Sequence, residues 1–187
     1  GHPTVGAGRR NALEIDLEIA RVFAGGRRRE RFVCVVARAR RGRADRDGCR
    51  LCLAAMQRHA GDEGVFIRSL SNRGNTGGLS AATQDLIVCL SAAGFDHILI
   101  ETVGGGQTEL GIMEAADTTT VLLVPEGGDA IQMLKAGLLE IADIFVVNKA
   151  DRPGAEDMKN MLASSSDVPV ILTEAYSGKG VQELWES

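Results

Sequence analysis

The sequence has 187 residues, of which 44% are hydrophobic and 25% are charged, and this composition is typical of one globular domain with a sizeable core. It contains no apolar run near the roughly 20 residues of a membrane-spanning helix and no secretory signal pattern, so we expect a cytoplasmic protein without a membrane partner. Four cysteines in this length exclude a disulfide scaffold.

Positive charge is concentrated at the start of the sequence, although the net charge is -4. Residues 1–58 hold 14 arginines against 6 acidic residues, and residues 59–187 hold 7 basic against 19 acidic residues. Arginine-rich surfaces can bind nucleic acid, but here no aromatic residues are interleaved to stack on bases. We therefore expect no nucleic-acid partner and interpret the arginines as a solvated segment.

The first stretch, GHPTVGAGRRN, resembles a phosphate-binding loop that lacks its lysine. In the frame GxxxxGK[ST], alanine stands at the lysine position and glycine at the position of the Mg²⁺-binding hydroxyl. In a frame shifted by two residues, two arginines take those positions and the hydroxyl is again missing. Backbone N–H groups ahead of a helix would still attract phosphate, so we expect weakened binding and strongly reduced hydrolysis. The candidate phosphate-binding residues are Gly1, Gly6, Ala7, Gly8, Arg9 and Arg10.

Apolar runs rich in Val and Ile alternate with helical patterns along the rest of the chain, which predicts βα units on a parallel sheet. Several runs lack polar alternation, as expected of strands buried on both faces. Helical faces are expected along residues 79–93, ended by Gly94, and along residues 131–142. Strands are expected at residues 32–37, 65–70, 97–102, 119–125, 143–149 and 168–173, and a short loop at residues 164–167.

The strongest functional signal is NKAD, Asn148-Lys149-Ala150-Asp151, at the end of a predicted buried strand. A carboxylate there accepts hydrogen bonds from the N1–H and N2–H groups of guanine. Adenine cannot satisfy the carboxylate, and burying it unpaired costs several kcal/mol. Asn148 either contacts the base edge or holds the loop, and the stem of Lys149 lies along the purine face. The alternative interpretation is a surface turn.

A second signal is ETVGGGQ, because Glu101 ends a predicted strand at the edge where parallel sheets bind ligands. Glu101 is placed to hold Mg²⁺ through water, or else to cap a helix. The glycines, Gly104 among them, let the backbone approach a γ-phosphate as a switch segment does. Gln107 either orients a water molecule or is simply exposed. The catalytic candidates are therefore Glu101 and Gln107.

A third segment, TEAYSGKG, begins with Thr173, Glu174 and Ala175 one βα unit after NKAD. Its small residues let backbone N–H groups reach the guanine O6 atom, and Ala175 is the expected contact. The glycine-rich stretch at residues 71–80 can be interpreted either as a switch that contacts phosphate or as a plain loop. A zinc site needs four ligands, and the pair Cys49 and Cys52 has no second pair of ligands in the sequence. We therefore do not predict a zinc site.

Residues 56–151, from MQRHAGDEG through ILIETVGGGQ to VVNKAD, closely resemble the methylmalonyl-CoA mutase-associated GTPases, the MeaB/ArgK family. The resemblance continues more loosely to Trp185. It implies an α/β P-loop NTPase fold, a three-layer α-β-α sandwich with a mainly parallel sheet, that binds GTP or GDP with Mg²⁺. It also implies a homodimeric, GTP-hydrolysing metallochaperone-type protein that assists and protects a cobalamin-dependent methylmalonyl-CoA or other acyl-CoA mutase.

The chain departs from this family in the segment Arg38–Ala55, which is rich in arginine and stands in place of the family's AVDPSSP region. Good family sequence lies on both sides, so we hypothesise that residues from about 9 to 55 are partly out-of-frame translation. The family's N-terminal extension, first strand and C-terminal dimerisation arm are missing. We therefore expect residues 1–187 to be one P-loop domain truncated at both ends.

We consider two other functions, one favoured by these departures and one not favoured by the composition. Loss of the P-loop lysine and hydroxyl favours a catalytically impaired pseudo-GTPase that binds a partner without turnover. A nickel- or cobalt-inserting metallochaperone would need loops rich in histidine or cysteine, and the sequence has only three histidines.

Overall fold

The computed structural model describes residues 32–38, 65–71, 79, 81–102, 110–125 and 138–187. They fall into two compact units, with the boundary between Asp117 and Thr118. Each unit contains a three-stranded sheet in which every strand pair is parallel. Within the described ranges, no helix is long and apolar enough to cross a bilayer.

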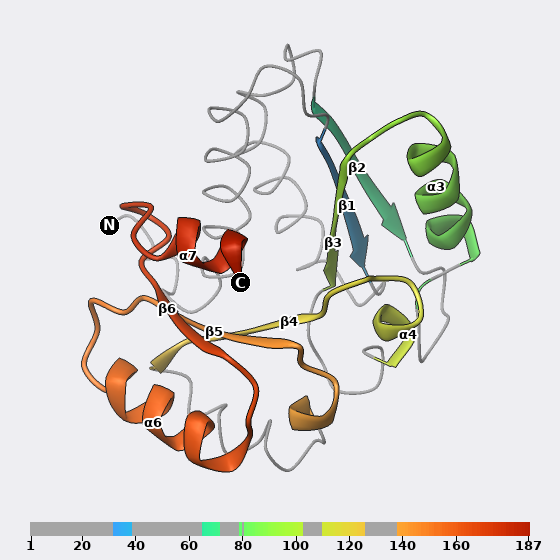
Figure 1. The fold of residues 1–187 in the computed structure, drawn as a ribbon. Coiled ribbons are helices and arrows are strands. Elements are labelled where there is room, and N and C mark those ends of the chain that lie inside the picture. The colour runs from blue at the N-terminus through green and yellow to red at the C-terminus, as the bar shows by residue number, and fades with distance from the viewer. Residues whose placement is uncertain (1–31, 39–64, 72–78, 80, 103–109, 126–137) are drawn as a thin grey trace, which may run out of the picture. The chain divides into compact units, whose positions relative to one another are not determined.

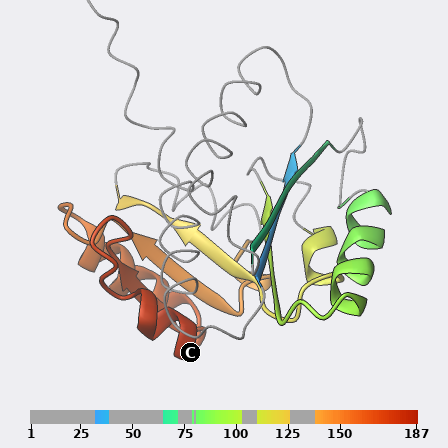
Figure 2. The same ribbon diagram turned by 90° about the horizontal axis from the view of Figure 1, so that it is seen from above.

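The first unit is built on the strands β1 (Phe32–Arg38), β2 (Val65–Ser71) and β3 (His97–Thr102), arranged in the order β2-β1-β3. Figures 1 and 2 show these three strands side by side with α3 (Ala81–Ala92) next to them. Leu90 of α3 is buried among side chains from both outer strands, Leu70 and Ile98. The short helix α4 (Leu110–Met113) adds Ile112 to a second cluster with Leu79.

Helix α3 ends as the sequence predicts, at a glycine. Gly94 has φ +80°, and its N–H donates to the Ser91 carbonyl at 3.0 Å. The N–H of Phe95 donates to the Leu90 carbonyl at 3.2 Å, and the Phe95 side chain packs against Leu90. These two hydrogen bonds and the apolar contact form a Schellman motif, which turns the chain from α3 into β3.

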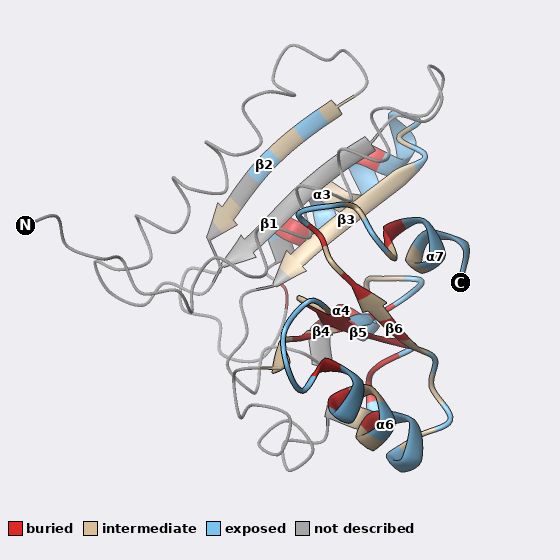
Figure 3. Ribbon diagram, turned by 90° about the vertical axis from the view of Figure 1, so that its left-hand side faces the viewer, coloured by how far each residue is buried: buried red, intermediate tan, exposed pale blue. Residues whose placement is uncertain are grey.

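The second unit carries the strands β4 (Thr120–Leu123), β5 (Ile144–Asn148) and β6 (Val170–Thr173), in the order β4-β5-β6. Every residue of β5 is buried, as the absence of polar alternation predicts, and this strand is red in Figure 3. A single turn of 3-10 helix, η4 (Leu138–Glu140), precedes β5.

Side chains of β5 alternate between two cores because successive residues of a strand point to opposite faces. Phe145 and Val147 pack with Met158 and Leu162 of α6 (Ala155–Ser165). Residues of the opposite face, among them Val146, pack with Leu184 of α7 (Val181–Glu186). The sheet of this unit is therefore covered by one helix on each face.

The predicted strands lie where the apolar runs predict them, but their ends differ by up to two residues. The runs 119–125, 143–149 and 168–173 correspond to the shorter strands β4, β5 and β6. One reason is that Lys149 has φ +59°, which ends the extended backbone at Asn148. The loop expected at residues 164–167 is wrong in part, because α6 continues to Ser165, where both serine hydroxyls bond back to the Met161 carbonyl.

Several expectations lie outside the described residues. They concern the opening loop, most of the arginine-rich segment, most of the glycine-rich stretch at 71–80 and the helix expected before residue 138.

Candidate functional site

The NKAD segment forms a tight turn directly after β5. The N–H of Arg152 donates to the Lys149 carbonyl at 2.9 Å, which closes a β-turn that has Asp151 at its third position. The N–H of Ala150 donates to the Thr173 carbonyl of β6 at 3.0 Å. Lys149 is the one non-glycine residue of the described chain with positive φ, a conformation that costs about 1–2 kcal/mol. The turn is thus held in a defined shape by its own hydrogen bond and by the hydrogen bond to β6.

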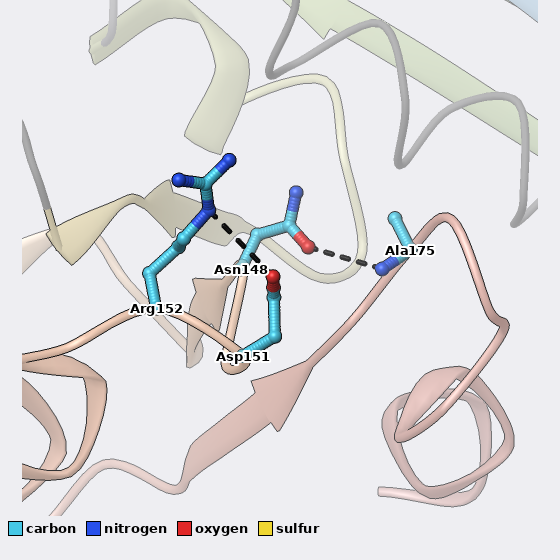
Figure 4. A network of polar contacts seen from close by, with 4 residues as sticks. All are labelled: Asn148, Asp151, Arg152 and Ala175. Atoms are coloured by element: carbon cyan, nitrogen blue, oxygen red, sulfur yellow. Dashed lines mark hydrogen bonds and ion pairs between the residues drawn. The ribbon is translucent and has the colours of Figure 1, made fainter.

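Asn148 connects this turn to the loop after β6. Its side-chain oxygen Oδ1 accepts hydrogen bonds from the Ala175 N–H at 3.2 Å and from the Thr173 hydroxyl at 3.3 Å. All three residues are nearly inaccessible to solvent, with exposed fractions of 1%, 2% and 0%. Because the Ala175 N–H can only donate, the amide must present its oxygen to it. Figure 4 shows this amide extending toward Ala175.

The other end of the same amide has no such partner. The Nδ2 atom of Asn148 is buried and finds no hydrogen-bond acceptor among the described residues. A buried donor left unsatisfied costs about 1–3 kcal/mol. Nδ2 is therefore a donor that a bound ligand or a water molecule can satisfy.

The loop after β6 is fixed independently of Asn148. Glu174 and Lys179 form an antiparallel bridge, in which the Glu174 N–H donates to the Lys179 carbonyl at 2.9 Å. The loop ends at Gly180, which has φ +76° and lies against β6. A Cβ atom at Gly180 would overlap the carbonyl oxygen of Leu172. This position therefore requires glycine, and α7 begins immediately after it.

Asp151 presents its carboxylate at the surface of the turn. Its Oδ2 atom lies 3.6 Å from Nε of Arg152, and the two side chains are 49% and 52% exposed, respectively. A buried carboxylate was expected to reject adenine through its desolvation cost, but the carboxylate of Asp151 is half exposed. The desolvation cost would therefore arise only when a base covers Asp151.

The remaining predicted site residues are only partly within the described chain. Thr173, Glu174 and Ala175 lie beside Asn148, whereas Glu101 lies in β3 of the first unit, half-buried and opposite Val36 of β1 in register. The structure therefore brings together the two segments expected to contact the base. Outside the described residues lie Gly1, Gly6, Ala7, Gly8, Arg9, Arg10, Gly104 and Gln107.

Two features of this site were missed by the sequence argument. Arg152 follows Asp151 directly, so its adjacency to an acidic residue was a visible signal for an ion pair. The hydrogen bond between Asn148 and Ala175 joins residues far apart in the sequence, and no local pattern indicates it. In the part of the chain that the structure describes, no group of three His, Cys, Asp or Glu residues forms a metal cluster.

Comparison with known proteins identifies the family. Residues 48–187 match the family model described as methylmalonyl Co-A mutase-associated GTPase MeaB. The chain belongs to this family. A Pyrococcus horikoshii protein named as a GTPase is 51% identical over 143 residues, covering 70% of this chain and 45% of the relative. The mouse mitochondrial methylmalonic aciduria type A homolog is 37% identical over 139 residues, covering 67% of this chain and 34% of the relative.

The chain thus spans less than half the length of these curated relatives. Among solved structures, HypB from Helicobacter pylori in complex with nickel has a TM-score of 0.59 and 20% identity, covering 98% of this chain and 81% of that chain. At this identity the likeness concerns the fold alone. Together with the parallel strands and flanking helices, it confirms the expected α/β P-loop NTPase fold. The family match confirms the resemblance to the MeaB/ArgK GTPases.

Proposed function

We propose that this chain binds the guanine base of GTP and GDP between the NKAD turn and the loop after β6. The observation that carries the proposal is the amide of Asn148, whose Oδ1 holds the Ala175 N–H while its buried Nδ2 has no acceptor among the described residues. Guanine presents the acceptors N7 and O6 on one edge, so Nδ2 would donate to that edge. The membership of the MeaB family supports this ligand class.

The carboxylate of Asp151 supplies the complementary half of the recognition. It would accept from the N1–H and N2–H groups of guanine, and its side chain is half exposed on the turn. Adenine has no N1–H and carries an amino group where guanine has O6, so it leaves Asp151 without its donors, although it keeps N7 as an acceptor for Nδ2. Sites that read a base through hydrogen bonds reject analogues strongly for this reason. The stem of Lys149 would lie along the purine face.

The Ala175 N–H was expected to donate to guanine O6, yet here it donates to Asn148 Oδ1 at 3.2 Å. Both acceptors could share this N–H, because three-centre hydrogen bonds are common in proteins. Thr173 and Glu174 would contribute by holding the loop that carries Ala175. The base site therefore needs little rearrangement to accept its ligand.

For the phosphates, the proposed residues are those of the opening loop, namely Gly1, Gly6, Ala7, Gly8, Arg9 and Arg10, together with Gly104. Glu101 would hold Mg²⁺ through water, and the ion when bound would neutralise phosphate charge. Gln107 would orient the attacking water. Because the sequence has no lysine in either register of the opening loop, we expect slow turnover.

We propose further that GTP binding and hydrolysis serve a cobalamin-dependent acyl-CoA mutase, which this protein assists and protects, and that the full-length protein acts as a homodimer. The description of the family and the name of the mouse relative support the mutase. Addition of the chain with GTP to such a mutase should slow its inactivation during turnover. Equal inactivation with and without the chain contradicts the mutase role.

The experiment that tests base recognition exchanges one hydrogen-bond acceptor for a donor. In Asp151→Asn, the amide donates to the O2 atom of xanthine, so the variant should lose GDP affinity and gain XDP affinity, each about tenfold or more. Isothermal titration with GDP, XDP and ADP measures this, and Asp167→Asn, at an exposed aspartate outside the turn, is the matched control. Unchanged GDP affinity in Asp151→Asn refutes the proposed base site.

A second candidate function is favoured by the altered opening loop, in which the lysine and hydroxyl are both replaced. The chain would then be a partner-binding module that retains guanine recognition but does not hydrolyse GTP. Single-turnover measurement of phosphate release distinguishes the two functions. Tight GDP binding without release of phosphate from GTP favours the module, and measurable release favours the GTPase.

A further inference from the structure

Arg152 lies beside the carboxylate that the proposed function assigns to guanine. Its Nε atom is 3.6 Å from Oδ2 of Asp151, and its backbone N–H closes the turn on the Lys149 carbonyl at 2.9 Å. In Figure 4 the side chains of Asp151, Arg152 and Asn148 extend from the turn toward the same side of the view. The backbone hydrogen bond fixes the position from which the Arg152 side chain extends. The ion pair then connects the Arg152 side chain to Asp151.

A half-exposed aspartate on a surface turn has rotational freedom that base binding must remove. The backbone at Asp151 is held by the turn, but its side chain can occupy several staggered rotamers. Freezing a side chain on binding costs affinity, and preorganising it restores that affinity. An ion pair with the adjacent guanidinium favours one orientation of the carboxylate before the base arrives.

The guanidinium and the base need not compete for the same lone pairs. An ionised carboxylate offers about four acceptor sites, of which guanine would use two. Arg152 contacts one oxygen, Oδ2, through Nε. Simultaneous binding is therefore compatible with the acceptor capacity of Asp151.

We propose that Arg152 is a positioning residue for guanine selectivity, which orients the Asp151 carboxylate for two-point contact with N1–H and N2–H. This inference rests on the proposed guanine site. It predicts a specific dependence on the 2-amino group of the base. A single contact with N1–H tolerates a wider range of carboxylate orientations than the paired contact does. Loss of Arg152 should therefore weaken GDP more than IDP, whose base lacks the 2-amino group.

The experiment compares GDP and IDP affinities of the full chain by isothermal titration for the wild type, Arg152→Met, Arg152→Lys and the control Arg68→Met. Arg68 is an exposed arginine of β2 in the first unit. Arg152→Met should lose about 2- to 5-fold in GDP affinity, the range expected of an exposed ion pair. Its preference for GDP over IDP should shrink, Arg152→Lys should be intermediate, and Arg68→Met should match the wild type.

Salt provides a second readout, because exposed ion pairs are screened as the Debye length falls from about 10 Å at 0.1 M to about 3 Å at 1 M. The difference in GDP affinity between wild type and Arg152→Met should therefore disappear at high salt. Equal losses for GDP and IDP, or a difference that persists at high salt, would indicate a merely structural role and overturn the inference. Selective GDP binding that is unchanged in Arg152→Met overturns it as well, while leaving the proposed function intact. A wild type that binds no guanine nucleotide overturns both.

Discussion

Replacing Asn148 with leucine tests the connection between the NKAD turn and the loop after β6. Leucine has the same branched shape, although it is larger, and it accepts no hydrogen bond, so the Ala175 N–H and the Thr173 hydroxyl lose their acceptor. Each group is buried, and each unsatisfied group costs about 1–3 kcal/mol. The substitution also removes the unpartnered Nδ2, which returns about 1–3 kcal/mol. We expect a net loss of about 1–3 kcal/mol in the free energy of unfolding.

Urea denaturation followed by circular dichroism measures this loss, and Asn160→Leu is the matched control because Asn160 is exposed on α6. The control should change the free energy of unfolding by less than about 0.5 kcal/mol, as surface substitutions usually do. GDP binding should be lost in Asn148→Leu and kept in Asn160→Leu. If Asn148→Leu is as stable as the wild type and binds GDP equally well, then the two hydrogen bonds do not stabilise the fold and the Asn148 amide does not bind the base.

Further predictions concern the packing that positions the site, and all are measured by chemical denaturation. Gly180→Ala should lose about 2 kcal/mol or more, because its Cβ would overlap the Leu172 carbonyl and φ is +76°. Gly94→Ala, at φ +80° with open space around it, should lose only about 1 kcal/mol, and equal losses in the two variants would contradict the overlap. Leu162→Ala should lose about 2–5 kcal/mol, because this side chain is 2% exposed in the core beneath α6, whereas the exposed Ala163→Ser should be nearly neutral. A small loss in Leu162→Ala would mean that the core collapses around the cavity.

Much of the site's location was predictable from local patterns. The uninterrupted apolar run before Asn148 predicts a strand buried on both faces, and every residue of β5 is buried. Parallel strands end at the same edge of their sheet, so the segments that follow β5 and β6 were expected to meet. The structure places Asn148 opposite Thr173 in register, which brings Ala175 to the amide.

Helix α6 and the end of this helix were not predicted from local patterns in the same way. Helix α6 was missed although Ala155, Met158 and Leu162 recur at helical spacing and make up its buried face. Burial of these three residues depends on the sheet against which they pack. The loop expected at residues 164–167 was wrong for Ser164 and Ser165, which belong to α6, because serine hydroxyls can bond to the preceding turn while the backbone remains helical.

The sequence by itself determined which residues are candidates for the proposed guanine site, since chemistry depends on residue type and since strand ends follow from apolar runs. Only the tertiary structure decided how those residues are engaged: Asn148 Oδ1 holds the Ala175 N–H, Nδ2 is left without an acceptor among the described residues, and Asp151 is half exposed beside Arg152. The physical reason is that hydrogen bonds and burial depend on distances between segments separated by a whole βα unit. Those distances are fixed by packing and not by the spacing of residues along the chain.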